Sequence, residues 1–342
     1  MQYLFLLVFL SGVSSACAQG DYPTPYGERE DVAAYLDAVA QEHDFPRATL
    51  QQWLSQAHQR QDIIDRISKP AETVWTWARY RGHLVDADRI QQGADFWGEH
   101  RDTLARAAEE FGVAEEYVVA ILGIETRYGQ VTGGYPVLDA LATLGFDYAP
   151  RSKFFRKELT ELLLLAREEG KDPRELTGSY AGAMGYGQFI PSSYRHYAVD
   201  FDADGIRDIW QNPQDAIGSI ANYFARHRWR GEGPVAIRVE PSAANVGKLD
   251  DIAGTTLALD HTLAEIYGLG IQVQGIDPDI DPQTKVAVYK LEGAQGDEYW
   301  LGLHDFYVIT RYNRSYMYAL AVHQLSQAIK QERDERVAQK PS

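Results

Sequence analysis

The sequence predicts an α+β protein that is mainly helical, with a small region of strands toward its carboxyl end. Apolar residues recur with the period of amphipathic helices through most of the chain before Trp229. Short runs of β-branched and aromatic residues, separated by Gly and Asp, follow that residue. A last helical pattern closes the chain. The 342 residues, 45% of them hydrophobic, suffice for two or three lobes.

The amino terminus predicts export. An apolar run at residues 3–10, followed by small residues up to Ala18, is typical of a signal peptide spanning residues 1–18. Cleavage after Ala18 would leave a mature chain without cysteine, because Cys17 is the only one. Lipidation of Cys17 is the alternative and would anchor the protein in the outer membrane, although Ser14 stands where a lipobox usually has a branched aliphatic residue. Either way we expect a periplasmic protein that folds without disulfides.

The first part of the mature chain is expected to be helical. Residues 19–27 contain two prolines and predict a flexible tether. A helical lobe should then occupy residues 28–112, joined by a C-terminal helix at 315–337. Within this lobe, an aromatic patch at 74–80 lies near a segment expected to be extended. The helices of the lobe are expected from Arg29 onward, at 48–58 and at 90–111.

A central core is expected at residues 113–232, built around a helix at 115–128 that Gly129 would cap. A carboxylate on the apolar face of this helix is costly to bury in its charged form, so its pKa should rise. Glu125 is therefore a candidate general acid, unless it is solvated or paired with a cation such as Arg127. The residues that point within roughly 60° of Glu125 are apolar or aromatic: Val118, Ile121, Leu122 and Tyr128.

Two regions follow this helix. Small residues, Tyr and Gln alternate at 179–192 with neither helical nor strand period, so this loop could bring backbone close to a ligand, or could be a tight turn between helices. A helix is also expected at 152–169. A small β lobe is expected at 233–314. Its predicted strands are residues 235–239, 285–291, 298–303 and 304–309.

Residues 200–215 predict an EF-hand-like calcium loop between two helices. Hard cations prefer oxygen ligands on alternate residues and a glycine at the sharp turn. Gln211 stands where such a loop has its bidentate Glu, so we expect Asp215 to replace it. A single loop without a second one indicates a structural site and not a sensor. The expected ligands are Asp200, Asp202, Asp204, the Ile206 carbonyl and Asp215, with Asp208 as a further candidate.

Composition and missing motifs exclude several classes of function. The net charge of −16 argues against nucleic acid as a partner. The chain lacks HExxH, Walker and dinucleotide spacings, and Ser179 is not in a nucleophile elbow, so no organic cofactor is expected. Ordinary glycosidases would need a second carboxylate roughly 5 to 9.5 Å from the first. Asp139 and Asp147 are the nearest in sequence, and spacing assigns neither; a substrate with its own nucleophile would need only one acid.

Four stretches in order resemble the membrane-bound lytic murein transglycosylase B family. They are residues 124–129 (IETRYG), 179–189 (SYAGAMGYGQF), 200–210 and 309–313 (ITRYN), and the resemblance covers nearly the whole mature chain. It implies a lysozyme-like catalytic core with a helical lobe and a small β lobe. It also implies a structural calcium ion and peptidoglycan glycan strands as the substrate.

The resemblance further implies how the bond between N-acetylmuramic acid and N-acetylglucosamine is cleaved. A lone acid, Glu125 here, would protonate the glycosidic oxygen and then act as a base while the C6 hydroxyl closes a 1,6-anhydro ring. Ser179 and Gln188 would orient the N-acetyl group or the sugar. A hydrolytic muramidase and a non-catalytic peptidoglycan-binding scaffold are the alternatives. The residues implied to line the glycan groove are Tyr80, Arg151, Tyr223, Tyr312, Asn313 and Tyr318.

Overall fold

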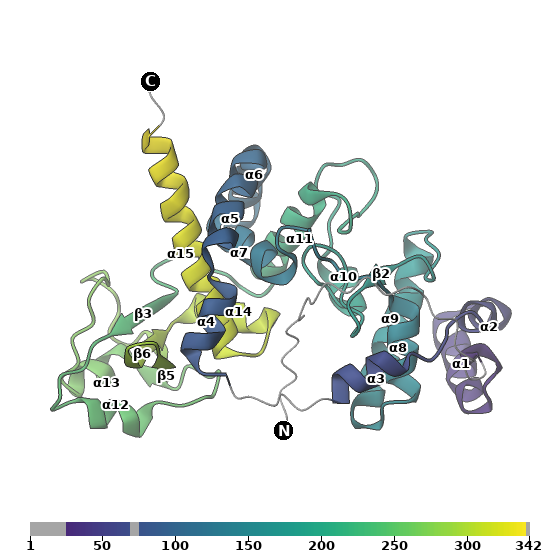
Figure 1. Cartoon of the computed structure of the whole chain (residues 1–342), viewed down its shortest axis with the longest axis horizontal. Coiled ribbons are helices and arrows are strands. Elements are labelled where there is room, and N and C mark those ends of the chain that lie inside the picture. Colours follow the sequence, from purple (N-terminus) through teal and green to yellow (C-terminus); the bar gives the residue numbers. More distant parts are fainter. Residues whose placement is uncertain (1–24, 69–74, 340–342) are drawn as a thin grey trace. The chain divides into compact units, whose positions relative to one another are not determined.

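The computed structural model describes residues 25–68 and 75–339, which form two compact units (Figure 1). The first unit contains residues 75–128 and 220–339, and the second contains 25–68 and 129–219. The chain passes from the second unit to the first within helix α11 (Pro213–Arg226). The predicted signal peptide and most of the predicted tether lie outside the described residues.

The second unit is mainly helical. Helix α9 (Ser152–Glu168) packs against α8 (Val137–Phe146) and α10 (Pro191–Tyr197). A short antiparallel ladder pairs β1 (Tyr135–Pro136) with β2 (Thr177–Gly178). The other elements of this unit are the 3-10 helices η1 (Tyr26–Glu28) and η2 (Ala149–Arg151) and the helices α1 (Glu30–His43), α2 (Arg47–Leu54) and α3 (Gln61–Ser68).

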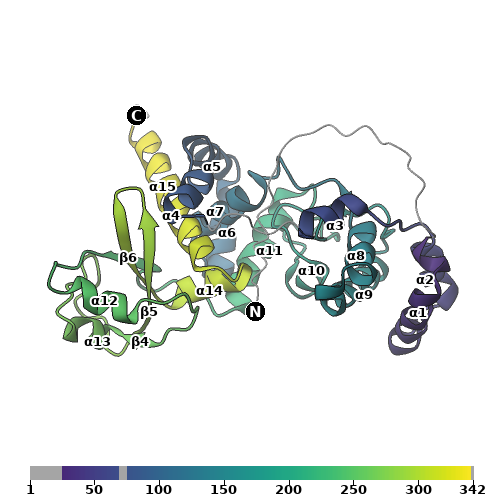
Figure 2. The same cartoon turned by 60° about the horizontal axis from the view of Figure 1, so that its bottom comes forward.

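In the first unit, helix α7 (Glu115–Thr126) is buried along nearly its whole length. It packs against α5 (Ala87–Glu99), α6 (Arg101–Phe111) and the long α15 (Tyr316–Gln339), and both views show α15 running beside α5 and α7 (Figures 1 and 2). α7 is thus packed between helices that directly precede it in sequence and the helix at the end of the chain. The remaining large helices are α4 (Trp77–Leu84) and α14 (His304–Tyr312).

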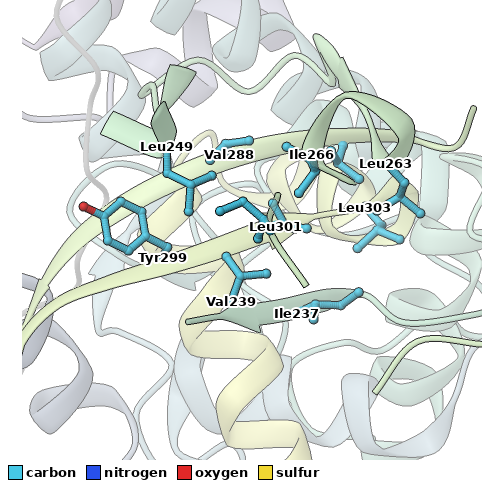
Figure 3. Packing of buried hydrophobic residues seen from close by; sticks show 11 residues of the cluster. Ile237, Val239, Leu249, Leu263, Ile266, Val288, Tyr299, Leu301 and Leu303 are labelled. Carbon is cyan, nitrogen blue, oxygen red and sulfur yellow. The ribbon is translucent and has the colours of Figure 1, made fainter. Parts of the chain in front are cut away.

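A four-stranded antiparallel sheet in the order β3-β6-β5-β4 completes the first unit. Alternate strand residues point into one apolar cluster, which α12 (Val246–Ile252) and α13 (Leu263–Gly268) also enter (Figure 3). Leu301 lies between Ile237 and Val288 on the neighbouring strands, so it occupies the centre of this cluster. The strands are β3 (Ala236–Val239), β4 (His261–Thr262), β5 (Lys285–Gly293) and β6 (Gly296–Gly302).

The strands predicted at 235–239, 285–291 and 298–303 are present, but the strand predicted at 304–309 is wrong. That segment forms α14, which starts directly after the sheet with Leu303 as its N-cap residue. Its aromatic and β-branched residues favour a strand locally, yet Phe306 packs on Gly302 and is buried as part of a helix. Tertiary packing therefore overrides the local propensity.

Three helix boundaries also differ from expectation. Tyr26 and Gly27, placed in the predicted tether, are buried in η1 because Tyr26 donates a hydrogen bond to the Asp147 carboxylate. The described part of the aromatic patch at 74–80 enters α4, capped by the Thr76 hydroxyl, and the patch is therefore helical from Trp77 onward. The helix predicted at 90–111 is two helices, α5 and α6, that meet at His100.

Helix α7 packs with α5 and α15 in the first unit, whereas the loop at 200–215 lies in the second. The bounds of the predicted lobes stay a prediction. Within residues 25–68 and 75–339, none of the helices combines the length and the apolar character needed to cross a bilayer.

Candidate active site

Glu125 lies at the end of α7, and a hydrogen bond from Tyr318 holds its carboxylate. The hydroxyl of Tyr318 donates to Oε1 at 2.5 Å. Burial raises the pKa of Glu125 to about 7, and the hydrogen bond from Tyr318 opposes part of that rise. The residue is nevertheless only half-buried, so it keeps contact with solvent. A protonated carboxyl group that can still be reached is what a general acid needs near neutral pH.

Arg127 does not pair with Glu125. Its guanidinium lies 3.7 Å from the carboxylate of Asp86, so the ion-pair alternative for Glu125 is not what the structure shows. Asp139 and Asp147, the nearest carboxylates in sequence, belong to the second unit, where Asp139 accepts the His58 amide and Asp147 binds Arg29. Both therefore have structural partners of their own.

Tyrosines surround Glu125 within the first unit. The pKa values of Tyr80, Tyr312 and Tyr318 are raised, mainly by burial and secondly by the negative charge of Glu125. All three hydroxyl groups therefore lie within electrostatic reach of the carboxylate. The ring of Tyr223 meets that of Tyr312 edge to face at 4.8 Å. Four of the predicted groove residues are thus gathered near the acid, and a fifth, Asn313, directly follows α14. Tyr318 is only 2% exposed and acts on Glu125 itself.

The backbone after Glu125 turns sharply. Arg127, Tyr128 and Gly129 all have positive φ angles, of 49°, 60° and 85°. The amide of Tyr128 donates to the Leu122 carbonyl at 3.0 Å, which closes the helix end. The expected cap at Gly129 is therefore wrong: Arg127 is the C-cap residue, and non-glycine residues rarely adopt this conformation. Such strain clusters at active sites.

Arg151, Ser179 and Gln188 belong to the second unit. The Ser179 hydroxyl accepts the amides of Ala181 and Ala183, at 3.4 and 3.0 Å, so it shapes its own loop. Gln188 has a φ of 51° and donates through Nε2 to the carbonyls of Thr132 and Gly185. Its Oε1 is buried and has no hydrogen-bond partner among the described residues, so one acceptor remains for a ligand. Arg151 lies over the ring of Phe154 at 4.3 Å.

The predicted calcium loop brings three carboxylates together. Oxygen atoms of Asp200, Asp202 and Asp204 lie within 4.8 Å of one another, and Gly205 makes the sharp turn with a φ of 93°. Converging carboxylates repel unless a cation binds between them, and they are the ligands that calcium prefers. The predicted helices on both sides of the loop are present as α10 and α11.

The other predicted ligands have additional roles. Asp215 is fully buried, and its two oxygens accept the amides of Phe201 and Asp208, each at 2.7 Å. The Asp208 carboxylate accepts the amides of Trp210 and Gln211. Both carboxylates therefore shape the loop, and their assignment as ligands, like that of the Ile206 carbonyl, stays a prediction.

Sequence reasoning did not identify Arg89, a buried arginine that binds the last turn of α7. A single Arg near the start of a helix carries no distinguishing pattern. Two glycines inside helices, Gly93 and Gly123, could have indicated a close contact here, because glycine is unfavourable inside a helix without a packing reason.

Comparison with known proteins defines the class. Residues 27–327 match the family described as Transglycosylase SLT domain. The membrane-bound lytic murein transglycosylase B of Escherichia coli is 38% identical over 313 residues, which is 89% of this chain and 84% of that protein. The soluble lytic transglycosylase SltB1 of Pseudomonas aeruginosa has a similar crystal structure, with a TM-score of 0.84, 45% identity, and coverage of 89% of this chain and 99% of that one.

Two further structures contain ligands. The lytic transglycosylase Slt35 of Escherichia coli, in complex with calcium, has a TM-score of 0.80 and 39% identity over 90% of this chain and 95% of that one. SltB3 of Pseudomonas aeruginosa, in complex with NAG-anhNAM-pentapeptide, has a TM-score of 0.76 and 29% identity over 90% of this chain and 80% of that one.

The chain belongs to the transglycosylase SLT domain family and is a lytic transglycosylase. The resemblance based on four motifs is confirmed, as is the lysozyme-like, mainly helical α+β fold.

Proposed function

We propose that Glu125 is the single acid and base of this lytic transglycosylase, acting on the bond between N-acetylmuramic acid and N-acetylglucosamine in peptidoglycan. The observation that carries the proposal is a half-buried carboxyl group whose pKa is raised to about 7 by burial. About half of such groups are protonated at neutral pH and can donate a proton. A relative's complex with an anhydro-sugar product supports the same reaction.

The reaction needs one proton to be donated and one to be accepted. Protonated Glu125 gives its proton to the glycosidic oxygen as the bond to C1 of the muramic acid breaks, and the N-acetyl group stabilises the positive charge at C1. The Glu125 carboxylate then takes the proton of the C6 hydroxyl, whose oxygen bonds to C1 and closes the 1,6-anhydro ring. The carboxyl group is protonated again at the end, so no second carboxylate and no water are consumed.

Other side chains bind and orient the substrate in this proposal. The free Oε1 of Gln188 accepts a sugar hydroxyl or amide, and Ser179 keeps the loop around Gln188 in shape. The flat faces of Tyr80, Tyr223 and Tyr312 suit sugar rings. Asn313 in the first unit and Arg151 in the second are further glycan-binding residues in this proposal.

We further propose that Asp200, Asp202, Asp204 and the Ile206 carbonyl bind calcium, with Asp215 and Asp208 supporting the loop or completing the shell. Three converging carboxylates and a glycine at the turn fit this cation. The ion would neutralise their charge and brace the loop. It would take no part in bond breaking, because every proton transfer is assigned to Glu125.

Export by the signal peptide at 1–18 to the periplasm is also part of the proposal, with an outer-membrane lipid anchor at Cys17 as the variant that the name of the Escherichia coli relative favours. Mass spectrometry of the amino terminus of the exported protein distinguishes cleavage after Ala18 from lipidation.

The test is a digest of purified sacculi analysed by mass spectrometry. The expected muropeptides are lighter by one water than those of a hydrolase, and the hydrolysed products would instead identify a muramidase. Glu125→Gln should abolish turnover. The matched control is Glu116→Gln, a buried glutamate of the same helix that pairs with Lys330 at 2.8 Å and should retain activity. Glycan binding by the wild type without any product would favour a scaffold.

A further inference from the structure

A buried arginine that the reaction above does not use holds the last turn of α7. Arg89, in α5, is 3% exposed. Its Nε donates to the carbonyl oxygen of Gly123 at 3.0 Å, and Gly123 precedes Glu125 by two residues. The same oxygen accepts the amide of Arg127 at 3.2 Å. Carbonyl groups at helix ends are short of intrahelical donors, so a side-chain donor added to the backbone bond at Gly123 is a specific anchor.

The guanidinium of Arg89 has further partners beside the Gly123 carbonyl. It donates through NH1 to the His83 carbonyl at 2.8 Å and to the Asp86 carboxylate at 2.5 Å. Asp86 in turn caps α5 by accepting the Arg89 amide at 2.9 Å. The paired carboxylate offsets the cost of burying the cation, and a positive charge is favourable at a helix carboxyl end. The rigid fork of donors therefore fixes α5 and α7 to each other.

A second contact joins the same two helices. The hydroxyl of Tyr128 donates to the carbonyl oxygen of Arg89 at 2.7 Å. A Cβ atom on either Gly93 or Gly123 would lie only 2.5 Å from that hydroxyl oxygen. The helices thus approach where only glycine fits, and the backbone on both sides of Glu125 is attached to α5.

We propose that Arg89 is a positioning residue, which fixes the direction of Glu125 through the Gly123 carbonyl; this inference rests on the proposed function of Glu125. Two residues would then position Glu125 through different atoms. Tyr318 contacts the carboxylate, whereas Arg89 contacts only the backbone of the helix end. Because the pKa of Glu125 is set by burial and by Tyr318, loss of Arg89 should change the rate without moving the pH dependence.

The test compares Arg89→Gln and Arg89→Lys with the wild type, on soluble uncrosslinked glycan strands. For Arg89→Gln we expect kcat to fall about 100-fold, because displacing a catalytic group by about 1 Å costs that much, with KM changed by no more than about twofold. The alkaline limb of the pH profile should stay in place. Arg89→Lys should recover part of kcat, since it keeps the charge and a donor but loses the fork.

Arg156 provides a matched control in the second unit. Its Nε donates to the Gly145 carbonyl at 2.8 Å, in the last turn of α8, so it makes the same kind of contact on a helix without Glu125. Arg156→Gln should lower the melting temperature yet leave kcat of the folded protein unchanged. Three results would overturn the positioning role. Folded Arg89→Gln could keep full kcat, its activity could fall only in proportion to the unfolded fraction, or Arg156→Gln could lose as much kcat.

Glu125→Gln in the same assay separates the positioning role of Arg89 from the proposed catalytic role of Glu125. If it is inactive while Arg89→Gln is fully active, only the positioning role fails. If Glu125→Gln is itself active, the proposed function fails first.

Discussion

At the scale of single residues, two opposing effects set the proton affinity of Glu125. Burial disfavours the carboxylate and raises its pKa to about 7, while the hydroxyl of Tyr318 donates to the carboxylate and lowers it. The residue is therefore poised between its two forms near neutrality, which suits a group that must first give and then take a proton.

Removing the hydroxyl of Tyr318 should move the pH dependence in a defined direction. Tyr318→Phe deletes a hydrogen bond that favours the charged form, so the pKa of Glu125 should rise further, by about one unit. Because the proposed mechanism needs Glu125 protonated, the alkaline limb of kcat/KM should shift to higher pH. Tyr117→Phe, which loses a bond to His323 at 2.9 Å instead, is the control and should leave the limb in place. A shift to lower pH would contradict the role of Tyr318.

Burial of Glu125 should also cost stability at high pH. Its folded pKa is raised from 4.5 to about 7, so the stability linked to this group is fully present below pH 4.5 and is lost as the pH rises through 7. Glu125→Gln has no titratable group at this position, so its stability should not fall in this way. We expect its free energy of unfolding to match the wild type near pH 4 and to exceed it by roughly 2 kcal/mol at pH 8, allowing for partial exposure. Denaturant titrations at both pH values measure this, and a difference independent of pH would contradict it.

At the scale of secondary-structure elements, the close approach of α5 and α7 depends on glycine. Gly93→Ala would place a Cβ atom 2.5 Å from the Tyr128 hydroxyl and 2.7 Å from Ile329, so we expect a loss of about 1–3 kcal/mol in the free energy of unfolding. Gly98→Ala, in the same helix, meets no atom within 4 Å and should be neutral or stabilising by up to about 1 kcal/mol. Denaturant midpoints of the two variants provide the comparison, and equal effects would show that the contact is not tight.

Elements with strong local signals were predictable, and those defined by distant partners were not. The strand at 285–291 and the helices on both sides of the acidic loop at 200–210 follow from alternation and turn residues. The segment at 304–309 has the composition of a strand, yet it is a helix because Phe306 packs on the preceding sheet. Periodicity reports which face of an element is apolar but not which partner covers it.

At the scale of the whole molecule, the site depends on contacts that span most of the sequence. Glu116, Tyr117 and Glu125 of α7 contact Lys330, His323 and Tyr318 of α15. Local patterns cannot reveal such pairs, because the residues are about 200 positions apart. Glu125 could be proposed as the acid from its helix face and motif, whereas the Tyr318 bond and the Arg89 anchor required the folded chain.

Calcium should stabilise the folded chain without being needed for bond breaking. Binding to the native state alone adds about 2.7 kcal/mol at a concentration 100 times Kd, so chelation should lower the melting temperature while activity at low temperature remains. Asp202→Ala should remove the response of melting to calcium. Exposed Asp37, which pairs with Arg47 at 2.6 Å, offers the control Asp37→Ala, which should keep that response. Unchanged melting of the wild type after complete metal removal would exclude a calcium site.

The turn after Glu125 has a consequence for the variation that this segment can tolerate. Arg127 is partly exposed, so surface rules alone would allow many replacements there. Its left-handed backbone conformation instead penalises every β-branched residue and favours Gly or Asn. In a saturation library selected for activity, Val, Ile and Thr should disappear from position 127, while neighbouring helix surfaces accept them. The backbone, more than the chemistry of the Arg127 side chain, would then limit how this position can evolve.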